Sequence, residues 1–172
     1  TVDLQVLSVN DAPQLLAPSS MSVNENTTGQ VLQVQGTDVD NEPVSLSISG
    51  GADAAAFQLD ASSGALSFIA GPDFESPGDS TADNRYELEV TVTDGSGASS
   101  TQQLQVDVTN VNDSPTVAPA TFVSAEEFSG PICVVDVSDP DSGDTLTLSI
   151  TGGNAQAAFD RSEERRVGPV CG

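Results

Sequence analysis

YELEVTVTDG, residues 86–95, alternates apolar and polar side chains over most of its length. Its apolar side chains recur at every second position: Tyr86, Leu88, Val90 and Val92. Successive side chains of an extended strand point to opposite faces of a sheet, so this pattern predicts a strand with one buried face. Asp94-Gly95-Ser96-Gly97 is typical of a hairpin turn, and a second alternating run occupies residues 104–108. The sequence therefore predicts a long β-hairpin.

Short apolar runs of the same kind precede this hairpin, and Gly, Asn, Asp and Pro separate them. They occupy residues 21–23, 31–34, 44–48, 57–59 and 66–68. With the hairpin they make about seven strands in roughly 100 residues, and no convincing helical pattern accompanies them. We therefore expect an all-β fold, a Greek-key β-sandwich of the immunoglobulin-like kind.

The sequence also contains an internal repeat. Val9-Asn10-Asp11-Ala12-Pro13 returns as Val111-Asn112-Asp113-Ser114-Pro115, so Asp113 follows Asp11 by 102 residues. LSISGG, residues 46–51, returns as LSITGG, residues 148–153, at the same spacing. A period of about 100 residues matches one sandwich domain, so we expect tandem domains. The predicted division is the last strand and linker of an upstream repeat (1–12), a complete repeat (13–114) and a truncated next repeat (115–160).

The last segment, residues 161–172, differs from the rest in composition. It contains three of the four basic residues of the chain, Arg161, Arg165 and Arg166. The segment resembles translated adapter read-through, which is a sequencing artefact. The alternative is a genuine basic loop, and we assign no function to it.

The charge balance excludes several function classes. The chain has 26 acidic residues, 4 basic residues and no histidine, which gives a net charge of −22. Nucleic acids and anionic membranes both attract Lys and Arg, so neither is expected as a partner. Without histidine, Ser-His-Asp and Cys-His catalysis are impossible within this chain, and we predict that it is not an enzyme. No apolar stretch is long enough to insert into a membrane, and Cys133 and Cys171 lack zinc-site spacing.

The acidic residues are clustered in pairs separated by one residue. These pairs are Asp38-Val39-Asp40, Asp73-Phe74-Glu75 and Asp139-Pro140-Asp141. In an extended chain the two carboxylates share one face, and at a separation of ~4 Å they repel by about 4 kcal/mol at an effective dielectric constant of 20. A bound cation removes this repulsion, and oxygen ligands without His or Cys favour calcium over zinc, copper or magnesium. For any single pair, the alternative is a solvated turn.

A glycosidase pair is a poor interpretation of Asp73 and Glu75. Glycosidase carboxyls flank a sugar ring from opposite sides, about 5–9.5 Å apart, whereas these two share one face of the chain. No aromatic platform for a sugar accompanies them.

The motifs of the middle repeat follow one another in a specific order: Val23-Asn24-Glu25-Asn26, Gly29, Val31, Thr37-Asp38-Val39-Asp40, Phe57-Gln58-Leu59-Asp60, Gly64, Asp73-Phe74-Glu75, Tyr86-Glu87-Leu88-Glu89-Val90, Thr93-Asp94-Gly95 and Val111-Asn112-Asp113-Ser114-Pro115. In this order they resemble a cadherin repeat, of the kind found in bacterial surface proteins. The resemblance covers the whole middle repeat and extends into both flanking segments, and it implies a cadherin-like sandwich in tandem repeats.

The resemblance also implies calcium held between consecutive repeats. The implied ligands after the middle repeat are Glu25, Asp73, Glu75, Asn112, Asp113, Asp139 and Asp141. Those before it are Asn10, Asp11, Asp38, Asp40 and Asp94. The linker departs from the animal cadherin pattern because it is one residue shorter and has Ser8 or Asn110 where that pattern has Asp. We therefore expect one to three ions per junction.

Two functions are consistent with this sequence. The first is a calcium-rigidified repeat of an extracellular adhesin whose parent protein is secreted or anchored at the cell surface. The resemblance implies adjacent repeats of the same chain as partners, with a second copy, a host or cell-surface protein, or a glycan as the adhesion ligand. The alternative is a passive calcium-stabilised spacer in a secreted multidomain enzyme, because sandwiches serve many functions.

Overall fold

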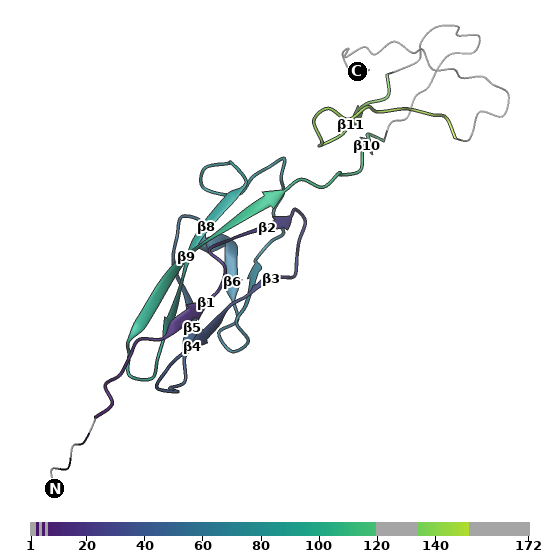
Figure 1. The fold of residues 1–172 in the computed structure, drawn as a ribbon. Helices are drawn as coiled ribbons and strands as arrows, with labels where there is room; N and C mark the ends of the chain where they lie inside the picture. Colours follow the sequence, from purple (N-terminus) through teal and green to yellow (C-terminus); the bar gives the residue numbers. More distant parts are fainter. Residues whose placement is uncertain (1–2, 4, 6, 120–133, 152–172) are drawn as a thin grey trace, which may run out of the picture. The chain divides into compact units, whose positions relative to one another are not determined.

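The computed structural model describes residues 3, 5, 7–119 and 134–151 (Figure 1). The chain divides into two compact units, Thr1–Val111 and Asn112–Gly172, and each is described separately below. The tail at 161–172 and most apolar positions of the strand predicted within residues 1–12 lie outside the described residues.

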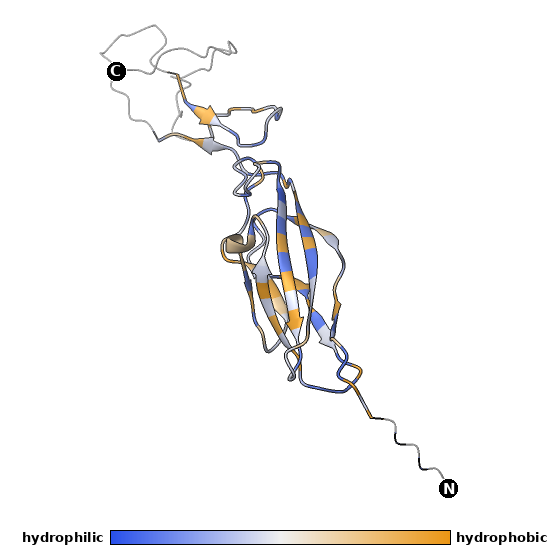
Figure 2. Ribbon diagram, turned by 90° about the vertical axis from the view of Figure 1, so that its left-hand side faces the viewer, coloured by the Kyte–Doolittle hydropathy of each residue, from blue (hydrophilic) through white to orange (hydrophobic). Residues whose placement is uncertain are grey.

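A four-stranded sheet forms one layer of the first unit (Figure 1). Its order is β2 (Ser20–Asn24), β9 (Ser99–Thr109), β8 (Arg85–Thr93) and β5 (Ser45–Gly50). β8 and β9 form the predicted antiparallel hairpin, with Leu88 opposite Leu104, and β2 runs parallel to β9. Hydrophobic and hydrophilic residues alternate along the long strands, as Figure 2 shows. The hairpin prediction is confirmed.

The second layer is a three-stranded antiparallel sheet. Its order is β3 (Gln30–Gln33), β7 (Ala65–Phe68) and β6 (Phe57–Leu59). The seven strands of these two sheets coincide with the seven runs that the sequence predicted. A separate pair, β1 (Gln14–Leu16) with β4 (Gln35–Thr37), was missed because neither short strand alternates apolar and polar side chains.

The core lies between the two sheets. Phe57 and Phe68 have ring centroids 4.3 Å apart, and Tyr86 packs edge-on against both at 5.9 and 5.1 Å. Leu66 and Val90 are completely buried. Burial of each such side chain contributes about 1.5–3 kcal/mol, so the two layers stabilise each other mainly by apolar contact.

Gly51 explains the paired glycines of the repeated LSISGG motif. Its φ is +104°, a backbone conformation that side chains disfavour. An added Cβ would also collide with the Leu88 Cα and the Glu87 carbonyl oxygen of β8. The chain can therefore cross this close to β8 only with glycine, before it enters the short 3₁₀ helix η1 (Ala54–Ala56).

Two buried carboxylates organise loops of the first unit. Asp53 accepts hydrogen bonds from the N–H groups of Ser80 at 2.7 Å and Glu87 at 2.8 Å. Asp79 accepts N–H bonds from the loop that follows it, including those of Asp83 and Asn84. Burial raises the pKa of Asp79, but these hydrogen bonds outweigh burial and place the pKa below its usual value. Neither carboxylate was singled out by the sequence analysis.

The second unit contains one short strand pair, β10 (Thr116–Val117) with β11 (Val137–Ser138), within its described residues. Thr116 lies opposite Ser138, just as Gln14 lies opposite Thr37 in the first unit. Thr116 follows Gln14 by 102 residues and Ser138 follows Thr37 by 101, so the internal repeat of the sequence is also a repeat of strand pairing.

Candidate metal sites

One group of three carboxylates lies where β2 and the linker meet in the first unit. Glu25 directly follows β2 and is 4% exposed, whereas Asp73 and Glu75 are exposed on the loop between β7 and β8. One oxygen from each of the three lies within 4.8 Å of the others. Phe74, between the two loop acids, packs against the core. Three carboxylates this close repel one another, and a cation among them would remove that repulsion.

Backbone and side-chain donors hold the two glutamates of this group in place. Glu25 Oε2 accepts the Phe74 N–H at 2.9 Å, and Glu25 Oε1 accepts the Val111 N–H at 2.8 Å. Asn110 Nδ2 donates to Glu75 Oε1 at 2.7 Å. Glu25 therefore connects the end of β2, the loop that carries Asp73 and Glu75, and the linker residue Val111.

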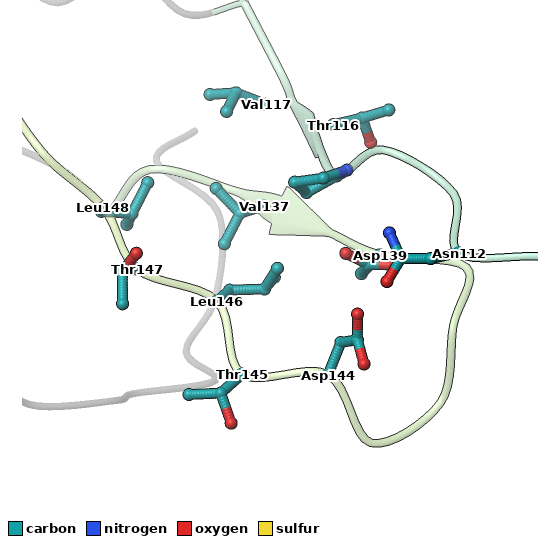
Figure 3. Close-up of a pocket in the computed structure, with 11 residues that line it drawn as sticks. Asn112, Thr116, Val117, Val137, Asp139, Asp144, Thr145, Leu146, Thr147 and Leu148 are labelled. Atoms are coloured by element: carbon teal, nitrogen blue, oxygen red, sulfur yellow. The ribbon is translucent and has the colours of Figure 1, made fainter.

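A second group of three carboxylates lies in the second unit. Asp139, Asp141 and Asp144 each bring one oxygen within 4.8 Å of the others. The Asp113 N–H donates to Asp141 Oδ2 at 2.6 Å, and Asn112 Nδ2 donates to the Asp113 carbonyl oxygen at 2.8 Å. Figure 3 shows Asp144 pointing toward Asp139 and Asn112, at the polar end of a pocket with apolar side chains at its other end.

Asp144 was missed by the sequence analysis. It lies three residues after the predicted Asp139–Asp141 pair, across a turn containing Ser142 and Gly143. A turn can bring a following acidic residue back toward such a pair, so this third acid was the signal available in the sequence.

The remaining predicted ligands form one hydrogen-bonded network in the first unit. Asn10 Nδ2 donates to Asp94 Oδ2 at 3.0 Å, and the Asp11 N–H donates to Asp40 Oδ2 at 2.8 Å. The Asp40 N–H donates to Asp38 Oδ1 at 2.7 Å. The five residues are brought together, but among the described residues their carboxylates do not form a group as close as the two above.

Asp94 is the most deeply buried member of this network, at 6% exposure. The hydrogen bond from the side-chain amide of Asn10 lowers the pKa of Asp94. Backbone N–H donors that include Ala98 and Ser96 lower this pKa further. Together these bonds outweigh burial, so Asp94 stays ionised. Asp38 Oδ2 is buried without a hydrogen-bond partner, which leaves an acceptor that a cation would satisfy.

Both units hold the linker aspartate in the same way. Asp11 donates its N–H to Asp40 in the first unit, and Asp113 donates its N–H to Asp141 in the second. The Asp141 N–H donates to Asp139 Oδ1 at 3.0 Å, which repeats the contact between Asp40 and Asp38. The Asp-x-Asp pair therefore has one local geometry that occurs twice.

The fold of the first unit and its acidic groups define a β-sandwich module with carboxylates at both ends of its long hairpin. The family model for the cadherin domain matches residues 19–109, more than half of the chain. The chain belongs to the cadherin family, and the family and the β-sandwich predicted from the sequence are confirmed. The bacterial source stays a prediction.

Proteins similar to this chain include several animal cadherins. Mouse protocadherin-15 is 29% identical over 170 residues, which cover 92% of this chain and 8% of that protein. The crystal structure of Drosophila N-cadherin EC1-4 has a TM-score of 0.53 at 27% identity and covers 78% of this chain and 35% of its own. Human protocadherin-24 EC1-2 (Form II) has a TM-score of 0.56 at 22% identity, over 78% of this chain and 64% of its own, and supports the fold alone.

The donor set of both carboxylate groups fits a hard cation. All candidate ligand atoms in them are oxygens, and calcium takes 6–8 oxygen ligands at roughly 2.3–2.6 Å. In the part of the chain that the structure describes, no helix has the length and apolar character to cross a membrane.

Proposed function

We propose that this chain is a calcium-binding cadherin repeat of an extracellular adhesion protein, in which calcium at the junctions between repeats makes the array rigid. The observation that carries the proposal is the Glu25–Asp73–Glu75 group, with its buried glutamate bonded to the linker residue Val111. A cation there would neutralise the group and restrain the linker at the same point.

The sequence pattern assigns ligands on both sides of each linker. After the middle repeat, Glu25, Asp73 and Glu75 are supplied by the first unit, and the linker and the second unit supply Asn112, Asp113, Asp139 and Asp141. Before it, the ligands are Asn10, Asp11, Asp38, Asp40 and Asp94. Backbone N–H bonds support this assignment for Glu25, Asp141 and Asp40, because they orient these three carboxylates.

Such a site suits an extracellular or cell-surface location. Extracellular modules bind calcium with dissociation constants of about 10⁻⁴–10⁻³ M, so they are filled by millimolar calcium and empty in a cytosol. Adjacent repeats of the same chain are the first partners. A second copy, a cell-surface protein or a glycan is the ligand for adhesion, and the chain spans too little of mouse protocadherin-15 to choose among them.

The test compares the chain in calcium and in chelator. Calcium at 10–100 times its dissociation constant stabilises the folded state by about 1.4–2.7 kcal/mol per ion, so the melting temperature should rise. The maximum particle dimension measured by small-angle X-ray scattering should also change. Asp73→Asn is expected to lose most of this gain, whereas Glu87→Gln, the same loss of charge on an exposed β8 residue, should keep it. The proposal fails if chelator alters neither the melting temperature nor the maximum particle dimension.

A further inference from the structure

We propose that Asn110 is a positioning residue for the Glu25–Asp73–Glu75 group, whose amide orients the Glu75 carboxylate before calcium binds. This inference rests on the proposed calcium function of that group. It assigns a role to the linker position at which the sequence departs from the animal cadherin pattern, where the residue is Asp.

The position of Asn110 is fixed by its neighbours on both sides. The Glu25 N–H donates to the Thr109 carbonyl oxygen at 3.0 Å, and the Val111 N–H donates back to Glu25 Oε1 at 2.8 Å. The backbone on either side of Asn110 is therefore in register with Glu25. From this fixed position, Asn110 Nδ2 reaches Glu75 Oε1 at 2.7 Å. Consecutive residues after β9 thus hold the two glutamates of one group.

The need for such a contact follows from the exposure of Glu75. Holding an exposed glutamate side chain in one rotamer costs conformational entropy when it binds an ion. A donor that fixes the side chain beforehand reduces the loss on binding. A carboxylate has about four acceptor sites on its two oxygens, so Glu75 can accept the amide and still bind a cation.

The chemical type of Asn110 is important here. Its amide is neutral, so it donates to one of the three carboxylates, that of Glu75, without adding a fourth negative charge to the group. An aspartate at the same position could not donate, and it would repel Glu75 in the metal-free protein. The geometry thus supports a role for Asn110 in orienting Glu75.

The experiment is calcium titration calorimetry on the full chain, with Asn110→Ala as the variant. Gln103→Ala is the matched control, because it removes another exposed amide–carboxylate bond, to Glu89 at 3.3 Å, on the sheet face. Asp73→Asn identifies which phase of the titration belongs to the group. We expect Asn110→Ala to raise the dissociation constant of that phase at least threefold and Gln103→Ala to leave it unchanged. In chelator, the melting temperature of Asn110→Ala should stay within about 1 °C of the parent chain.

The outcomes separate this role from the proposed function. If the parent chain and Asp73→Asn both bind no calcium, the proposed function fails and the role of Asn110 fails with it. If Asp73→Asn weakens binding but Asn110→Ala binds as tightly as the parent chain or more tightly, only the role of Asn110 is overturned. The role would also be overturned if Asn110→Ala lost as much folding stability in chelator as it lost binding free energy for calcium. The residue would then act on the fold alone.

Discussion

Replacing the buried glutamate of the first carboxylate group should have two separable effects on stability. In Glu25→Gln the side chain keeps its shape, but it loses the charge and one of its two acceptor oxygens. The remaining oxygen can accept only one of the two N–H groups that Glu25 holds, those of Phe74 and Val111. The variant therefore leaves one backbone donor facing an amide NH₂ group.

The size of the first effect follows from those two bonds. A hydrogen bond to a charged group contributes about 1.5–3 kcal/mol, and the variant loses one and weakens the other. Loss of a charge next to Asp73 and Glu75 also relieves some repulsion. Water screens these two exposed side chains, so the relief is less than about 1 kcal/mol rather than the ~4 kcal/mol of a pair at ~4 Å and a dielectric constant of 20. In chelator we therefore expect Glu25→Gln to lower the free energy of unfolding by about 1–2 kcal/mol. In saturating calcium it should also forfeit the ion's contribution of about 1.4–2.7 kcal/mol, which roughly doubles the penalty.

Tyr86 provides the assay, because it is the one tyrosine in a chain without tryptophan. It is 3% exposed in the core of the first unit, so its fluorescence during urea unfolding reports on that unit. Glu87→Gln is the control and should change the free energy of unfolding by less than about 0.5 kcal/mol in either buffer. An equal penalty for Glu25→Gln in calcium and in chelator would refute the role of Glu25 in binding the ion. A penalty near zero in chelator would refute the hydrogen-bond argument.

Three further predictions concern single positions. Gly51→Ala should destabilise the first unit by at least about 2 kcal/mol in urea unfolding, because it combines a strained φ with a collision against β8, and an unchanged midpoint would contradict that geometry. Asp94→Asn should cost about 1–2 kcal/mol in chelator, because its carboxylate accepts the Asn10 amide and several loop N–H groups; equal stability of the two proteins would count against this network. Burial raises the pKa of Tyr86 above its usual value of 10.0, so the unfolded chain ionises first and stability, fully present below about pH 10, should fall as pH rises further. Tyrosinate absorbance at alkaline pH should then appear together with unfolding, and ionisation of the folded protein at the usual pKa would contradict burial of the ring.

The strands that the sequence predicted are those whose side chains face a large core. β8 and β9 alternate buried and more exposed residues over much of their length, and their apolar and polar residue types alternate with the same period. β1 is Gln-Leu-Leu, whose two apolar residues are adjacent, and β4 is Gln-Gly-Thr, so neither shows an alternating apolar pattern. β6 is equally short, but Phe57 and Leu59 recur at every second position. The pattern of apolar side chains, more than strand length, separates the found strands from the missed ones.

The candidate sites were predicted in part for a different reason. Spacing identified Asp73 and Glu75 because two residues along an extended chain restore the same face. Glu25 could be identified only through the family resemblance, since a lone glutamate after a strand has no distinctive spacing. The donors that orient it, the N–H groups of Phe74 and Val111, belong to the backbone and leave no mark in the side-chain sequence.

The buried acids of the first unit show what distinguishes a structural carboxylate from a candidate ligand. Asp53 and Asp79 accept hydrogen bonds from loop N–H groups and, among the described residues, belong to neither close group of carboxylates. Glu25 also accepts two N–H bonds, but it lies within 4.8 Å of the carboxylates of Asp73 and Glu75. Backbone donors can stabilise one buried anion, whereas three adjacent anions retain a mutual repulsion that such donors do not cancel. The acids behind the net charge of −22 therefore include two distinct kinds in this fold: acids already stabilised by the backbone, and acids whose arrangement calls for a cation.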